Sequence, residues 1–160
     1  MKTIETLKNS TVTLRRYSES DIELLYEKLG KDPEIARYTG WNPYSTMESC
    51  SEFVHEIVSG YESDSDAYGW IIEADNIPVG EIGAYGYLTE DRSIEIGYSI
   101  FREFWGKGYA TEALSLVLDF LKDIREIETV RAWTATDNQK SERVLLKNGF
   151  EKTEIKDKAL

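Results

Sequence analysis

Two glycines flank a lysine at Gly106-Lys107-Gly108, directly before a segment of helical periodicity. Glycine has no side chain, so the backbone N–H groups of the following helical turn can approach an anion closely. The helix dipole adds about half a positive charge at the same place, and the Lys107 ammonium could add a mobile one. This spacing predicts a phosphate-binding turn, although a glycine turn that merely connects a strand to a helix could have the same sequence.

The turn differs from two common nucleotide-binding motifs. A P-loop would need a glycine five positions before Gly106 and a hydroxyl residue in place of Gly108. The dinucleotide fingerprint has three glycines and opens a βαβ unit, whereas this turn follows a run of predicted antiparallel strands. The glycines alone therefore leave the phosphate ligand unidentified.

Few other side chains in the sequence are suited to nucleophilic or metal chemistry. The chain has one cysteine, Cys50, and one histidine, His55, which excludes an internal disulfide and a multi-cysteine zinc site. Cys50 falls on the apolar face of a predicted helix, where a thiol is typically an inert part of the core. We therefore expect no metal cofactor and no acyl-cysteine intermediate.

Two segments resemble known signatures. The segment IEIGYSIFREFWGKGYATEAL, residues 94–114, resembles the acetyl-CoA-binding motif of the GNAT N-acetyltransferase superfamily. The segment TDNQKSERVLLKNGF, residues 136–150, resembles its second signature, in which an asparagine and a serine three apart precede a helix that ends near Gly-Phe. The similarity runs from about Thr11 to Ile155, and the type that the chain resembles most is the RimJ/RimL-like ribosomal-protein N-terminal acetyltransferase.

This resemblance implies a binding site for acetyl-CoA as co-substrate. The pyrophosphate would bind main-chain amides of Gly106, Lys107, Gly108, Tyr109, Ala110 and Thr111. The pantetheine arm would lie along a strand in the manner of an added strand, in contact with Ser99, Ile100 and Phe101 and, from the other side, with Asn138. Lys147 or Arg143 could reach the adenosine phosphate, or could be ordinary surface charges. Glu103 stands where the family usually has Gln or Arg, so we expect its carboxylate to point away from the pyrophosphate.

The resemblance also implies direct transfer of the acetyl group to a primary amine in a ternary complex. Glu95 matches an acidic position of the family and is the predicted base, with Glu81 on the neighbouring strand as the alternative. Ser141 matches the family position near the thiol, where its hydroxyl would bond to the developing thiolate. Contacts with the acceptor, either a protein N-terminus or a small-molecule amine, are predicted for Tyr38, Trp41, the nearby Tyr44 and Glu81.

Apolar periodicity predicts the elements that position these groups. Strands are expected at Thr11–Arg15, Tyr68–Ala74, Ile77–Tyr87, Ser93–Phe101, Thr129–Thr136 and Phe150–Ile155. Helices are expected at 20–30, 45–61, 110–124 and 138–147, the first two with capping boxes at Ser20-Asp21-Ile22-Glu23 and Ser45-Thr46-Met47-Glu48. This order predicts one domain over residues 1–160 with an α+β fold: an α/β/α three-layer arrangement around a mixed, mostly antiparallel sheet with helices on both faces.

Charge separates the chain into two halves. The net charge is −11, and residues 1–91 carry all of it, with 7 basic and 18 acidic residues against 12 of each in residues 92–160. An acidic chain is a poor ligand for nucleic acid or an anionic membrane, because affinity for phosphate comes from Lys and Arg. The acidic half could attract a cationic acceptor or could serve solubility alone. No signal peptide or membrane span is apparent, so a cytoplasmic location is expected.

Two other functions stay open at this point: a non-catalytic acyl-CoA-binding or regulatory module of the same fold, and a scaffold whose acidic face docks a basic protein. Glu103 and the short segment after Phe150 favour the first of these. That short segment also leaves a sheet edge uncovered, which predicts a possible homodimer.

Overall fold

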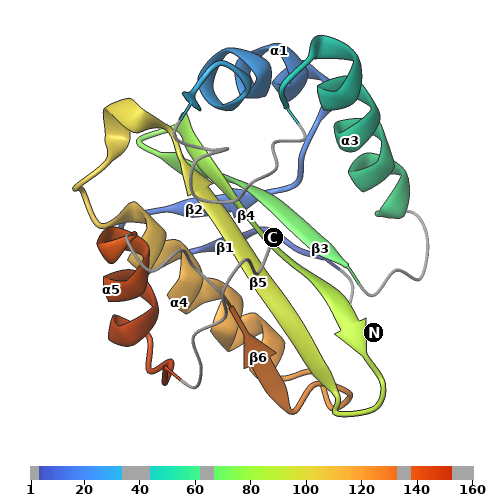
Figure 1. Cartoon of the computed structure of the whole chain (residues 1–160), viewed down its shortest axis with the longest axis vertical. Helices are drawn as coiled ribbons and strands as arrows, with labels where there is room; N and C mark the ends of the chain where they lie inside the picture. Colours follow the sequence, from blue (N-terminus) through green and yellow to red (C-terminus); the bar gives the residue numbers. More distant parts are fainter. Residues whose placement is uncertain (1–3, 34–43, 62–66, 133–137, 153–160) are drawn as a thin grey trace.

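A computed structural model describes residues 4–33, 44–61, 67–132 and 138–152 of the chain (Figure 1). Within these residues the central sheet has six strands. Spatial order follows chain order, from β1 to β6. The strands are β1 (Leu7–Lys8), β2 (Thr13–Arg15), β3 (Tyr68–Ala74), β4 (Ile77–Leu88), β5 (Ser93–Ile100) and β6 (Thr129–Arg131). All neighbours are antiparallel except β5 and β6, which are parallel. The prediction of a mixed, mostly antiparallel sheet is confirmed.

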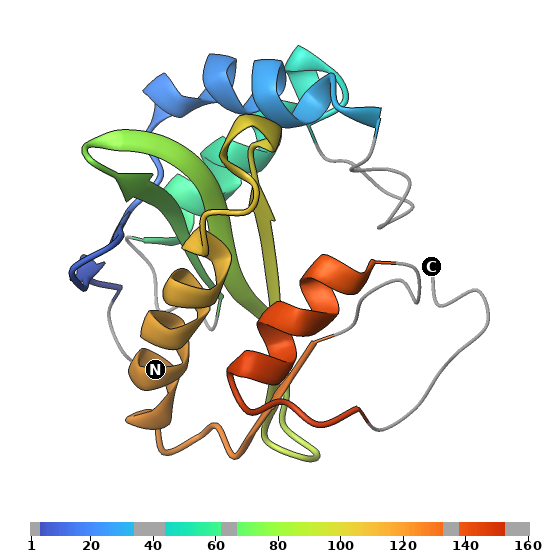
Figure 2. The ribbon, with the colours of Figure 1, turned by 90° about the vertical axis from the view of Figure 1, so that its left-hand side faces the viewer.

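Helices cover both faces of this sheet, as Figure 2 shows. The helical elements are η1 (Glu19–Asp21), α1 (Ile22–Leu25), η2 (Tyr26–Gly30), α3 (Met47–Gly60), η3 (Arg102–Phe104), α4 (Tyr109–Lys122) and α5 (Gln139–Lys147). The elements α1, η2 and α3 pack on one face, and α4 packs on the other with α5 beside it (Figures 1 and 2). We call these the α3 face and the α4 face, and together with the sheet they form the predicted three layers.

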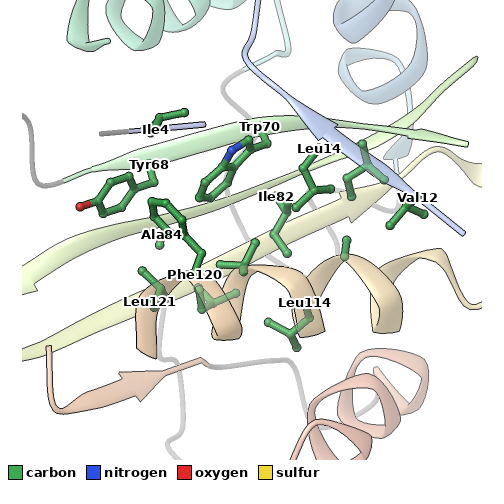
Figure 3. Packing of buried hydrophobic residues seen from close by; sticks show 14 of the residues in the cluster. Ile4, Val12, Leu14, Tyr68, Trp70, Ile82, Ala84, Leu114, Phe120 and Leu121 are labelled. Carbon is green, nitrogen blue, oxygen red and sulfur yellow. The ribbon is translucent and has the colours of Figure 1, made fainter. Parts of the chain in front are cut away.

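Trp70 is at the centre of the larger core, between the sheet and α4 (Figure 3). Its ring meets Phe120 of α4 edge to face at 5.3 Å, and its Nε1–H donates to the Glu5 carbonyl at 2.9 Å. Leu114 and Leu121 of α4 share the face of α4 that contacts this core. Burial of each such side chain contributes about 1.5–3 kcal/mol.

The α3 face has a smaller core. Ile71 of β3 points to it, because residues alternate along a strand and its neighbours Trp70 and Ile72 belong to the α4 face. Leu25 and Val54 cover Ile71 from α1 and α3. This second core fixes the helical layer over the middle strands, where Tyr44 and Glu81 lie.

The local caps differ from the prediction. The first capping box begins at Ser18 with Asp21, and the second pairs Thr46 with Ser49. Asp21 takes this role because its carboxylate is held in place by Arg15, at 2.8 and 2.9 Å, a contact that the local sequence pattern does not contain.

The end of the described chain also differs from the prediction. Residues 150–152 are not in a strand, and the rest of the predicted strand Phe150–Ile155 lies outside the described residues. Of the predicted strand Thr129–Thr136, the structure shows Thr129–Arg131, and positions 133–137 are likewise outside. Within the described ranges, none of the helices has both the length and the apolar composition to cross a bilayer.

Candidate active site

The glycine turn lies at the N-terminus of α4, as predicted. Gly106 has a φ of 80° and Gly108, the N-cap of the helix, a φ of 81°. A Cβ at either position would have no heavy atom within 4 Å, so backbone conformation rather than space requires glycine there. The Glu112 N–H is bonded to the Gly108 carbonyl at 3.2 Å. The amides of residues 109–111 precede that bond and have no intrahelical acceptor, which is the arrangement that binds anions.

Charged side chains beside the turn are paired with partners in other elements. The Glu103 carboxylate forms an ion pair with Lys28 of η2, which neutralises it. Arg102, the neighbouring residue, forms an ion pair with Asp32. Two cations lie over the Trp105 ring: the Arg102 guanidinium, 5.2 Å from the ring centroid, and the Lys140 ammonium of α5, 4.7 Å from it. These contacts connect the turn to both helical layers.

Within the described ranges, one edge of β5 has a β6 partner only at its start. β6 pairs with β5 only at Ser93, Ile94 and Glu95. On the opposite side β5 pairs with β4, where the Phe101 N–H donates to the Val79 carbonyl at 2.9 Å.

Because backbone groups alternate between the two sides of a strand, Ser99 directs its N–H and C=O toward β4. Tyr98 and Ile100 direct theirs toward the open edge. The Ile100 carbonyl accepts from the Trp105 Nε1–H at 2.7 Å. The backbone groups that could pair with an added strand are therefore those of Tyr98 and the Ile100 N–H.

Ser141 lies at this open edge, in the first turn of α5. Its Oγ is 2.8 Å from the Tyr98 hydroxyl, which is also within bonding distance of the Ser141 carbonyl, at 3.2 Å. Asn138 caps α5 by accepting the Ser141 N–H at 3.3 Å. Burial raises the pKa of the Tyr98 phenol, and the bond to Ser141 partly opposes that rise. The phenol is therefore a neutral donor at physiological pH, and it can pass a hydrogen bond on through Ser141.

Glu81 is held by two tyrosines of the α3-face core, Tyr17 after β2 and Tyr44 before α3. The Tyr17 hydroxyl donates to its Oε2 at 2.6 Å, and the Tyr44 hydroxyl donates to the same oxygen. Burial raises the pKa of Glu81, and the two tyrosine bonds partly offset this rise. Burial and the Glu81 charge raise the pKa values of both phenols well above 10, so they remain donors. The result is a carboxylate with a fixed orientation and a reduced preference for the ionised state.

Glu95 lies on the same face of the sheet as Glu81. Glu81 pairs with Ser99 and Glu95 pairs with Tyr85, while Gly83 and Gly97 pair between them. Directly opposed residues share a face, so Glu81, Tyr85 and Glu95 all point toward the α3 face. Two carboxylates and one phenol are thus available to a positively charged acceptor there.

The structure separates the predicted residues into two groups. Ser141 and Asn138 lie at the open edge of β5, near the turn formed by Gly106, Lys107 and Gly108 and the first α4 residues Tyr109, Ala110 and Thr111. Glu95, Glu81 and Ser99 point to the α3 face. Phe101 is buried in the α3-face core. Tyr38 and Trp41 lie outside the described residues. Tyr17 was not predicted, because no sequence signal connects it with Glu81, 64 positions away.

Comparison with known proteins gives a consistent result. Residues 11–151 match the family model described as an acetyltransferase (GNAT) domain. The chain is 29% identical over 148 residues to the uncharacterized N-acetyltransferase YoaA of Bacillus subtilis (strain 168), covering 91% of this chain and 82% of YoaA. It is 25% identical over 150 residues to the uncharacterized N-acetyltransferase p20 of Bacillus licheniformis, covering 93% of this chain and 84% of p20.

Solved structures share the fold. RimL, a ribosomal L7/L12 alpha-N-protein acetyltransferase in complex with coenzyme A, superimposes with a TM-score of 0.80 at 21% identity, over 91% of this chain and 84% of RimL. The microcin C7 self-immunity acetyltransferase MccE, in complex with acetyl-CoA and AMP, gives 0.76 at 20% identity, over 89% and 79% of the two chains.

Proposed function

Because this chain belongs to the GNAT acetyltransferase family, we propose that it transfers an acetyl group from acetyl-CoA directly to a primary amine in a ternary complex. The observation that carries the proposal is the glycine turn at the N-terminus of the 14-residue helix α4, which follows β5 and the short helix η3. Among the described residues, the outer edge of β5 has no strand partner after Glu95. An anion-binding turn beside an open strand edge suits a ligand with a pyrophosphate and an amide-containing arm. Acetyl-CoA has both.

Separate groups of residues bind the two parts of the co-substrate. The amides of residues 106–111 bind the pyrophosphate. The open edge at Tyr98 and Ile100 bonds with the pantetheine amides, next to the predicted contacts Ser99 and Phe101 and opposite Asn138. Lys140 of α5, which lies 4.7 Å from the Trp105 ring centroid, supplies positive charge on that side.

The reaction forms one C–N bond and breaks one C–S bond. The neutral amine nitrogen attacks the thioester carbonyl carbon, the tetrahedral intermediate expels the thiolate, and the amine loses a proton. Ser141, supported by the Tyr98 hydroxyl 2.8 Å away, donates a hydrogen bond to the departing sulfur. A carboxylate on the α3 face accepts the amine proton. Such proton transfers typically contribute about 10²–10⁴-fold to the rate.

Two carboxylates can act as this base. Glu95 is the proposed one because it is the last β5 residue with a β6 partner among the described residues, next to the open edge. Glu81 is the alternative: burial raises its pKa, and two tyrosine hydroxyls hold its carboxylate in one orientation. Replacing Glu95 with Gln should lower kcat and should remove the fall of kcat at acidic pH. Glu81→Gln should mainly raise KM for the amine. If Glu95→Gln keeps the wild-type pH dependence of kcat and Glu81→Gln loses it, then Glu81 is the base.

The proposed acceptor is a cationic amine, either a protein N-terminal α-amine or a small molecule. The acidic residues of the first 91 positions favour its approach. An α-amine with a reference pKa of about 7.7–8 needs less help from a base than a lysine at about 10.4. Because salt screens the attraction by the acidic residues, turnover with cationic acceptors should fall as salt rises, and turnover with uncharged amines should not.

We further propose that a homodimer covers the β6 edge, which light scattering at micromolar protein would test.

Calorimetry tests the binding half of this proposal. The full-length protein should bind acetyl-CoA with a dissociation constant in the micromolar range or below and should bind dephospho-coenzyme A detectably through the same turn. Absence of acetyl-CoA binding at high micromolar ligand would contradict the proposed function.

A further inference from the structure

Tyr85 of β4 lies across the neighbouring strand at Gly97. A Cβ built on Gly97 would come within 2.3 Å of the Tyr85 hydroxyl oxygen and within 3.2 and 3.3 Å of two ring carbons. The phenol therefore takes up the space that a side chain at position 97 would occupy. Tyr85 is nevertheless 44% exposed, so its ring is not a core residue and remains accessible from the α3 face.

Gly97 is a gap in the row of side chains on this face of β5. Along the strand, the neighbours that share the face are Glu95 and Ser99, two positions away on either side. Position 97 lies between Glu95, the last β5 residue with a described β6 partner, and Tyr98, whose backbone faces the open edge. The Tyr85 hydroxyl lies at this position, between the pairs Tyr85–Glu95 and Glu81–Ser99.

We propose that Tyr85 is a specificity-determining residue of the acceptor site, which selects primary amines on an unbranched carbon. Its hydroxyl contacts the acceptor nitrogen at Gly97, and its ring excludes a substituent on the carbon next to that nitrogen. The inference rests on the proposed function and names the substrate class for it.

Electrostatics agree with this placement. Burial raises the pKa of the Tyr85 phenol to about 12, and the charges of Glu95 and Glu81 add to the rise. The phenol therefore stays protonated, and both carboxylates are near enough to attract an ammonium group toward it.

A matched pair of acceptors tests the proposal. Glycinamide and alaninamide carry the same charge and differ by one methyl group on the carbon next to the amine. The wild-type protein should favour glycinamide in kcat/KM by about 10-fold or more, the usual effect of one methyl group in a restrictive site. Tyr85→Ala should reduce this preference at least about fivefold by admitting the methyl group. Tyr85→Phe should keep the preference and lower kcat/KM for both amines about tenfold, through the lost hydrogen bond.

Tyr87→Phe is the matched control, because Tyr87 lies on the same strand but donates to the Glu126 carbonyl, at 2.6 Å. It should show the wild-type preference. Equal glycinamide preference in the wild type and Tyr85→Ala would overturn the inference and leave the proposed function intact. Absence of turnover with any primary amine by wild-type protein that binds acetyl-CoA would contradict the proposed transferase activity itself, and the inference with it.

Discussion

The Tyr98 hydroxyl on β5 lies 2.8 Å from the Ser141 Oγ on α5. This contact joins β5 to α5 beyond Glu95, the last β5 residue with a β6 partner in the described part of the chain. It also links the two motifs, one from residues 94–114 and the other from residues 136–150, that the sequence presents separately. We propose that this hydroxyl pair donates the hydrogen bond to the departing thiolate.

Replacing Ser141 with Ala should lower kcat about ten- to hundredfold, the effect of losing one hydrogen bond to a charged group. The KM for acetyl-CoA should change little, because the turn at Gly106–Gly108 is untouched. Tyr98→Phe should have a smaller effect, since it acts through Ser141, and the double variant should be no slower than Ser141→Ala. Steady-state kinetics measure all three, with Ser115→Ala on the exposed side of α4 as the control. Additive losses in the double variant would show that the two hydroxyls act independently.

Gly108→Ala should weaken acetyl-CoA binding about tenfold, measured by calorimetry. The φ of 81° is unfavourable for alanine by about 1–2 kcal/mol, so the turn must shift and its amides with it. Gly86→Ala is the matched control: its φ is 65°, a Cβ would also have open space, and it lies in β4. Both variants should lose similar stability in urea unfolding. Equal acetyl-CoA affinity of the two variants would contradict a role for the turn in binding.

Glu81 should make stability depend on pH in a defined direction. Burial raises the pKa of Glu81, so the ionised carboxylate is disfavoured in the folded state. Its stabilising contribution is complete below the unfolded value of about 4.3 and is lost as pH rises through the raised folded value. The free energy of unfolding of the wild type, relative to Glu81→Gln, should therefore fall as pH increases from about 4. Urea unfolding at several pH values measures this difference.

Tyr17→Phe provides an internal check on that pH dependence. The Tyr17 bond lowers the pKa of Glu81. Its removal should therefore raise that pKa further, so that the decline in stability starts at the same pH and continues to higher pH. Superimposable curves for the wild type and Glu81→Gln would show that Glu81 does not titrate as the structure indicates.

Cys50 should be inert toward thiol reagents in the native protein. It is fully buried, its thiol contacts the Ile22 carbonyl at 3.3 Å, and burial raises its pKa to about 11. Since the thiolate is the reactive form, a disulfide reagent such as DTNB should label no thiol at neutral pH and one per chain after denaturation. Rapid labelling of the folded protein would contradict the packing of α3 against α1.

The sequence was sufficient for features that depend on local pattern. Strand β3 at Tyr68–Ala74 and the glycine turn before α4 are where periodicity and glycine spacing predict them. The first capping box was wrong by two positions, because Arg15 holds the Asp21 carboxylate that forms it, and the second was wrong by one position. The environment of Glu81 could not be predicted at all. Tyr17 and Tyr44 reach it from 64 and 37 positions away, and only the packing of the helical layer on the sheet brings them together.

Acetyl transfer itself is the most direct test of the central claim. The purified protein is incubated with acetyl-CoA and, separately, each member of a panel of primary amines that includes basic N-terminal peptides, polyamines and amino-acid amides. Thiol release is followed with DTNB, which the buried Cys50 should not disturb, and the amine product is identified by mass spectrometry. We predict amine-dependent thiol release with one acetyl group added to the amine per thiol released. Binding of acetyl-CoA without an acetylated product from any amine would contradict the claim and identify the chain as an acyl-CoA-binding module.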